Sequence, residues 1–135
     1  MAITPNSIIT PQTPKTATAV CATANTTYGN TPTNTAVLVN AASQAVRVVR
    51  ITAIPRATVT ATQLQLFLSK DNGVTMRLID SALMPAYTMA ATTAAPKTDF
   101  GYSDDNPMLL QAGDTLYAAI GVTGDIAFRA EMAEY

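Results

Sequence analysis

Two apolar runs around one turn constrain the fold of this chain more than any other feature. Residues 63–69 and 74–80 are rich in Leu, Ile, Phe, Val and Met, and they flank the sequence DNG at positions 71–73. Asp-Asn-Gly between two such runs is typical of a β-hairpin turn. The pattern therefore predicts two antiparallel strands that meet at this turn.

The hairpin has two possible registers. A two-residue loop pairs Lys70 with Thr75, whereas a three-residue loop pairs Lys70 with Val74. We favour the three-residue loop, with Gly73 in the left-handed region, because it gives one face made only of apolar side chains. That face comprises Leu64, Leu66, Leu68, Val74, Met76 and Leu78.

The opposite face of this hairpin is mixed, since it carries Phe67, Arg77 and Ile79. It is too apolar for a surface that faces only solvent. We expect it to be covered by the edge of a second sheet, by the segment 83–107 or by a partner subunit.

The last third of the chain predicts a second hairpin. Leu116, Ala118, Ile120 and Val122 alternate on one run, and Ile126, Phe128, Ala130 and Met132 alternate on the next. A three-residue loop at 123–125 pairs large with large and small with small residues, so we expect these two strands to be neighbours in one sheet. Arg129 and Glu131 would then point away from the core.

Further strands are expected at residues 16–23, 36–40, 46–54 and 108–110, with a turn at 112–114. Run 46–54 is apolar on both faces and should be covered on both sides, with Pro55 ending it. Strict alternation assigns its faces as Val46, Val48 and Ile54 on one side, and Arg47, Val49, Ile51 and Ala53 on the other. Residues 83–107 contain three prolines and either hide a short element near 87–91 or cross between sheets.

These patterns predict an all-β fold: an antiparallel, jelly-roll-like β-sandwich of about eight strands. No segment of ten residues or more has a helical stripe. The 135 residues suit one domain, at 16–135, preceded by an extended arm at 1–15 with Pro5, Pro11 and Pro14. The arm either frays or lies on a neighbouring subunit, for which Ile3, Ile8 and Ile9 would be anchors.

Composition excludes several kinds of chemistry. There is no histidine and only one cysteine, so His-based triads, Cys–His pairs and zinc clusters have no residues to form them. With a net charge of −1 and no basic patch, nucleic-acid binding is not expected. No signal peptide or membrane-spanning run is evident. Cys21, between Val20 and Ala22, is expected to be a small buried hydrophobe.

Several polar residues are candidates for a cation site or a subunit contact. Asp104 and Asp105 precede Asn106 and Pro107, which favours a turn over a calcium loop. Strand ends carrying Asp80, Asp99, Asp114 and Asp125 could gather a weak cation, although ordinary turn bonding is favoured. Four arginines lie close together in the sequence, and their side chains either face solvent on the strands or contact another subunit. They are Arg47, Arg50, Arg56 and Arg77. We therefore expect no catalytic, cofactor-binding or metal residues, and no enzymatic activity.

Two segments carry a resemblance to known proteins. Residues 66–79 (LFLSKDNGVTMRLI) and 110–121 (LQAGDTLYAAIG) resemble small structural proteins of tailed bacteriophages, and size and fold are similar to capsid cement or head decoration proteins. The resemblance implies a virion protein, assembled in the host cytoplasm, that forms a homotrimer and binds the major capsid protein.

The same resemblance admits an alternative, a phage tail or baseplate protein or a receptor-binding module for glycans. A glycan site would need exposed aromatic side chains or calcium ligands at loop tips. Its candidates are Tyr87, Phe100, Tyr102, Asp104 and Asp105.

Overall fold

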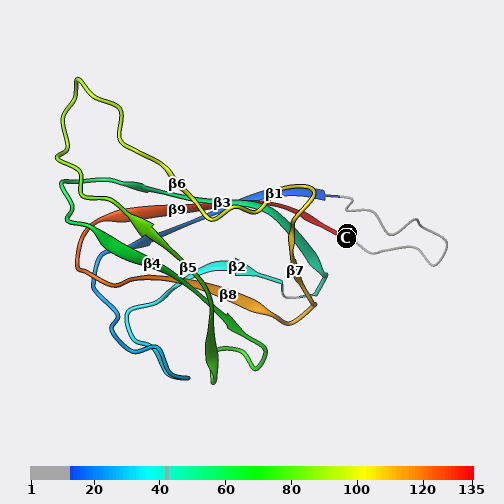
Figure 1. Ribbon diagram of the computed structural model, residues 1–135. Helices are drawn as coiled ribbons and strands as arrows, with labels where there is room; N and C mark the ends of the chain where they lie inside the picture. Colours follow the sequence, from blue (N-terminus) through cyan, green and yellow to red (C-terminus); the bar gives the residue numbers. More distant parts are fainter. Residues whose placement is uncertain (1–12, 42) are drawn as a thin grey trace.

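The protein is a sandwich of two antiparallel β-sheets, seen in a computed structural model that describes residues 13–41 and 43–135 (Figure 1). Nine strands and no helix occur in this part of the chain. They are β1 (Thr13–Cys21), β2 (Ala36–Asn40), β3 (Val46–Pro55), β4 (Thr62–Ser69), β5 (Met76–Met84), β6 (Thr98–Asp99), β7 (Met108–Leu110), β8 (Thr115–Ile120) and β9 (Ile126–Glu134).

Strand pairs nest inside one another along the sequence. One sheet has the order β1-β9-β3-β6, with β7 also paired to β3, and the other has the order β2-β8-β4-β5. The first strand therefore pairs with the last, β2 with β8, β3 with β6 and β7, and β4 with β5. This is the winding of a jelly roll, with β6 and β7 as two pieces of one strand, and it confirms the predicted fold class.

The core lies between the two sheets and is formed mainly by alternate residues of the longer strands, whereas β5 contributes only Met84 and β6 contributes no buried residue. Its largest side chains are Phe128, Ile51, Leu64, Leu66, Met84, Leu110, Leu116, Ile120 and Ile126, all fully or almost fully buried. The alternating apolar sets predicted for the last third of the chain point into this core, apart from Val122, which lies beyond the end of β8 and is exposed.

The predicted second hairpin is wrong, because β8 and β9 lie in different sheets. β8 pairs with β2 and β4, whereas β9 pairs with β1 and β3. Residues 121–125 therefore cross from one sheet to the other. Both strands contribute to the core cluster, from opposite sheets, so the two apolar sets meet face to face instead of side by side. Alternation specifies which face is buried, but not whether its partner is in the same sheet.

The first hairpin exists as β4 and β5, but its predicted register is wrong. Ser69 pairs with Met76 and Leu68 with Arg77, which leaves a six-residue loop at 70–75. This is the register of the rejected two-residue loop. A bulge then shifts the pairing so that Leu66 pairs with Asp80. Gly73 does adopt a positive φ of 89°, as expected, and Asn72 does as well.

A bulge also corrects the prediction for 46–54. Val48 pairs with Met132 and Arg50 with Glu131, which leaves Val49 as an extra residue in β3. The buried face is consequently Val46, Val48, Ile51, Ala53 and Pro55. The apparent apolarity of both faces came from counting straight through the bulge. Pro55 is the last residue of the strand instead of the residue after it.

β1 begins at Thr13, so the first described residues of the predicted arm belong to the sheet. Residues 13–15 pair with β9, and Pro14 is tolerated because β1 is an edge strand whose other side has no strand partner in the described chain. Residues 1–12 of the arm lie outside the described residues.

Segment 83–107 crosses between the sheets, as one of the two predicted alternatives required. It leaves β5 in one sheet and enters β6 in the other, after a single bridge between Tyr87 and Val59. Loop 99–102 is held in place: the Phe100 amide donates to the Ile51 carbonyl oxygen at 3.0 Å, and the Tyr102 hydroxyl donates to Asp80 Oδ2 at 2.6 Å.

The outer face of the four-stranded sheet is covered by the connection between β1 and β2, which no sequence argument anticipated. Asn25 lies in this connection and bonds to Gln65 on β4 at 2.8 Å, and both side chains are fully buried. Further along, the carbonyl oxygen of Asn30 accepts from the Met76 amide. Phe67 is fully buried on β4. The predicted mixed face does not exist as one surface, because Arg77 pairs with Leu68 and Leu78 with Phe67, which places Arg77 on the other side of the sheet from Phe67. Ile79, at the bulge, stays 43% exposed.

Gly73 gives a test of how closely the hairpin loop packs against Tyr117 on β8. A Cβ at Gly73 would lie 2.7 Å from Tyr117 Oη, whereas Gly101 has a similar φ of 93° and no heavy atom within 4 Å. We expect Gly101→Ala to cost about 1–2 kcal/mol through backbone strain alone, and Gly73→Ala about 1–3 kcal/mol more through the clash.

The measurement is the free energy of unfolding in urea. Adding Tyr117→Phe to Gly73→Ala should recover most of the extra loss, since the next nearest Tyr117 atom is 3.7 Å from the Cβ. Equal losses for the two alanine variants would show that Tyr117 does not restrict the loop.

Candidate functional site

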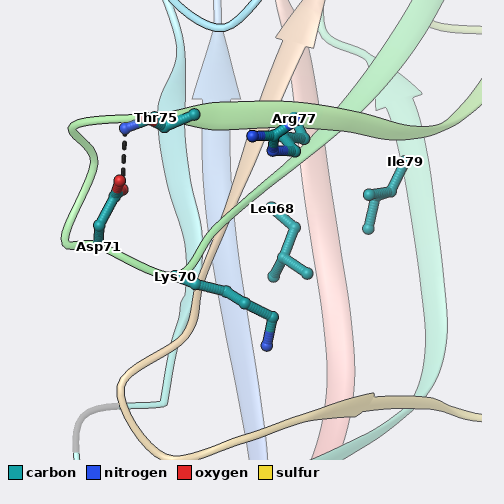
Figure 2. Close-up of a pocket in the computed structure, with 6 residues that line it drawn as sticks. All are labelled: Leu68, Lys70, Asp71, Thr75, Arg77 and Ile79. Carbon is teal, nitrogen blue, oxygen red and sulfur yellow. Dashed lines mark hydrogen bonds between the residues drawn. The ribbon is translucent and has the colours of Figure 1, made fainter.

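The best candidate for a functional surface is a groove at one end of the sandwich, called here the end groove. It consists of two adjoining pockets of ≈ 350 and ≈ 790 Å³ that share Leu68 and Lys70. The smaller lies against β5, where Arg77 and Ile79 line it together with Leu68 (Figure 2). The larger lies beside β7 and the C-terminal residue. Its apolar lining is Ala45, Val46, Leu68, Leu109, Leu110 and Tyr135.

The hairpin loop that borders the groove is fixed by side chains. Ser69 Oγ donates to Asp71 Oδ1 at 2.9 Å and accepts from the Gly73 amide at 2.8 Å. Asp71 Oδ1 also accepts from the Thr75 amide at 2.8 Å, the contact drawn in Figure 2. This backbone hydrogen bond is the main reason that the pKa of Asp71 is lowered. The loop therefore presents a defined wall to the groove.

Lys70, in the hairpin loop, forms an ion pair and a hydrogen bond with residues on the opposite wall of the groove. Its Nζ lies 3.1 and 3.2 Å from the two carboxylate oxygens of Asp114 and 3.2 Å from Gln111 Oε1. The Asp114 side chain is only 6% exposed and also accepts from the Gln111 amide at 2.9 Å. A buried carboxylate needs such a partner. The ion pair therefore fixes the hairpin loop against the turn between β7 and β8.

Exposed apolar side chains border the groove on both sides. Leu109 on β7 is 64% exposed and Ile79 on β5 is 43% exposed. Arg77 has no ion pair or hydrogen bond among the residues that the structure describes. A groove with apolar walls and one internally paired lysine is suited to an apolar peptide segment more than to proton transfer or metal binding.

The aspartates that the sequence suggested as ligands of a cation do not meet at one site in the fold. Asp80 accepts from Tyr102, Asp99 accepts from the Gly101 amide, Asp114 binds Lys70, and Asp125 lies 3.6 Å from Arg56 Nε. Within residues 13–41 and 43–135, no group of three or more Cys, Asp or Glu side chains is placed to hold a metal ion. Asp104 and Asp105 lie in an exposed loop closed by backbone bonds between Ser103 and Asn106.

The four arginines lie in different places. Arg47 is on β3 and donates to the backbone oxygen of Asp104, while its Nε is buried without a partner in the described chain. Arg50 is exposed on the same strand, Arg56 follows it beside Asp125, and Arg77 borders the end groove. They do not form a single basic patch at one pocket.

The aromatic side chains proposed as a glycan-binding site each make contacts within the protein. The Tyr87 hydroxyl lies 2.7 Å from Thr93 Oγ1. The Phe100 ring lies 6.4 Å from that of Phe128 and packs against the core. Burial, and to a smaller extent the hydrogen bond to Asp80, raises the pKa of Tyr102. These rings therefore do not form an exposed stacking platform.

Cys21 is buried, as predicted, at 3% exposure, and its thiol donates to the Ala118 carbonyl oxygen at 3.4 Å. Burial raises its pKa to about 11. The thiolate is the reactive form. We therefore expect iodoacetamide at pH 8 to leave the folded protein unmodified and to alkylate it fully in urea. Mass spectrometry of both samples is the measurement, and rapid modification of the folded protein would contradict this assignment.

Comparison with known proteins gave no match. No family model fits the chain, and neither curated proteins nor solved structures include one similar enough to identify a relative. A search of the described residues also finds no helix with the length and apolarity needed to cross a membrane.

Sequence reasoning missed the end groove itself. Leu109 and Leu110 were assigned to a short strand, and Lys70 and Asp114 to two separate turns. The only available signal was that a lysine, Lys70, lies at the first turn and an aspartate, Asp114, at the second. Nothing in the local pattern indicates that the two turns meet, because the groove forms between strands far apart in the sequence.

Proposed function

We propose that this chain is a structural protein of a tailed-phage virion, a capsid cement or head decoration protein that forms a homotrimer and binds the major capsid protein. The observation that carries the proposal is the end groove, with exposed Leu109 and Ile79 on a rigid jelly roll. Apolar side chains gathered beside a groove favour a protein contact. The resemblance of segments 66–79 and 110–121 to phage structural proteins supplies the biological setting.

The outer face of the five-stranded sheet also suits assembly. Its cross-strand rows, Thr16–Glu131–Arg50 and Thr18–Arg129–Thr52, combine small side chains with charges of both signs. Such a surface is flat enough to lie against another protein, and paired charges would orient it. Weak contacts of this kind, repeated by symmetry, can hold a shell together.

The proposal is tested in two steps. Light scattering after size-exclusion chromatography should give three chain masses for the purified protein. The protein should then bind to heads assembled from the accompanying major capsid protein and appear as regular surface features by electron microscopy. A monomer that does not bind heads would overturn the proposal. Binding to tails alone would identify the protein as a tail or baseplate component instead.

The glycan-binding alternative is not favoured by any observation, since its aromatic candidates are held by internal contacts. A glycan array, read with and without calcium, is the direct check. A specific hit would restore that alternative.

A further inference from the structure

We infer that the end groove of one copy binds the N-terminal segment, residues 1–12, of a second copy. This inference rests on the proposed assembly function and identifies the contact that would link the subunits. The groove is described above, and the steps below concern the fit of its occupant.

The start of β1, to which the segment is joined, lies at the same end of the molecule as the groove. Thr13, the first residue of β1, pairs with Glu134 on β9, and Glu134 also pairs with Val46. The next residue, Tyr135, donates its amide to the Ala45 carbonyl oxygen, and Ala45, Val46 and Tyr135 all line the groove. An ion pair of 2.7 Å between Lys15 and Glu134 fixes the start of β1 at this end.

The chemistry of the segment matches that of the groove. The sequence MAITPNSIITPQ has no charged side chain and carries three isoleucines. In the larger pocket, which Arg77 does not line, Lys70 is already paired with Asp114, so an apolar occupant there would not separate this charge from its partner. Pro5 and Pro11 oppose a helix, so the segment would enter extended. Ile3 and Ile9 then lie on one side and Ile8 on the other.

Direction favours a second copy over the same chain. β1 is at one edge of its sheet and β7 is on the far side of β3, so three strand spacings, roughly 14 Å, separate them. To enter its own groove, the chain would have to turn sideways at the start of β1 and pass the ends of β9 and β3. Pro11 and Pro14 favour extended backbone at the residues before them, which opposes that turn. Twelve extended residues span about 40 Å, enough to reach a neighbour.

The first test uses full-length substitution variants. Ile9→Asp and Leu109→Asp should each weaken self-association about ten- to a hundredfold, the change expected from one lost apolar anchor. Leu83→Asp is the matched control, because Leu83 is 71% exposed on β5 and does not line the groove. Sedimentation velocity over a concentration series measures association, and thermal melts confirm that each variant folds.

The second test identifies which chain provides the segment. Ile9→Cys and Leu109→Cys proteins, mixed and treated with a short bis-maleimide, should give covalent dimers, since the native Cys21 is buried. Efficient cross-linking inside single chains of the double variant, with none between chains, would overturn the exchange between copies. Multimers unaffected by the aspartate variants and without cross-links would overturn the groove assignment while leaving the proposed function standing. A monomer under all conditions would overturn both.

Discussion

Asn25→Ala is expected to lower the free energy of unfolding by about 3–5 kcal/mol, although Asn25 lies in a loop. The Asn25 side chain is fully buried and makes four hydrogen bonds. Its Oδ1 accepts from the amides of Thr27 at 3.2 Å and Thr33 at 3.0 Å. Its Nδ2 donates to Gln65 Oε1 at 2.8 Å and to the Thr27 carbonyl oxygen at 3.0 Å. Alanine would leave the fully buried Gln65 Oε1 without this donor and would remove the three bonds that hold the loop at Thr27 and Thr33.

Urea denaturation followed by circular dichroism measures this effect. Asn30→Ala is the matched control, because Asn30 lies in the same loop with an exposed side chain and contacts Met76 only through its backbone oxygen. We expect Asn30→Ala to change the free energy of unfolding by less than about 0.5 kcal/mol. If the two variants were equally stable, the connection between β1 and β2 would not be part of the cooperative fold.

Phe128→Ala is expected to have an effect of similar size, about 3–5 kcal/mol, by opening a cavity between the sheets. Phe128 is fully buried on β9, where its neighbours in the sheet are Ala19 of β1 and Ala53 of β3. These two alanines are too small to fill the space. The Phe100 ring, 6.4 Å away, would lose its contact as well.

Phe128→Leu separates the loss of volume from the loss of the ring. It keeps an apolar side chain at the position and should cost less than half as much as alanine, when both are measured in guanidinium chloride. A loss below about 1 kcal/mol for Phe128→Ala would mean that the sheets close over the missing ring, and the core between β9 and loop 99–102 would then be loosely packed.

Much of the fold could be predicted from the local pattern. The residues of β2 and the buried positions of β8 and β9 follow directly from alternation, because side chains on a strand point to opposite faces in turn. Gly73 has the positive φ expected at its turn, and Gly113 lies in the turn predicted at 112–114. The jelly-roll class followed from the number of short strands between turn signals.

Pairing could not be predicted in the same way. Thr123, Gly124 and Asp125 have the composition of a hairpin turn, but the strands on either side separate into different sheets. The bulges at Val49 and Ile79 are also invisible to a count of alternation, and each moves later residues to the other face. The single extra residue Val49 was therefore enough to reverse the predicted face of Ile51. The register of the first hairpin differs already at Ser69 and Met76, next to the loop, so there it was the loop length that the local pattern did not specify.

The candidate site was less predictable than the fold. Lys70 and Asp114 are 44 positions apart and each reads as an ordinary turn residue, yet they form the ion pair across the end groove. Leu109 gives no sign in the sequence that it stays exposed, because an apolar residue in a short strand is usually read as core. Only the position of β7 beside β3 explains its exposure.

The sequence by itself determined that this chain is an all-β sandwich and which side chains most of its strands bury, because strand periodicity and turn residues act locally. It also excluded histidine chemistry, since no histidine is present. Tertiary structure alone decided which strands pair, that Asn25 of the β1–β2 connection bonds to Gln65 on β4, and that the two turns at Lys70 and Asp114 meet beside a groove. Those features depend on contacts between distant parts of the chain, and a local pattern is compatible with several such arrangements.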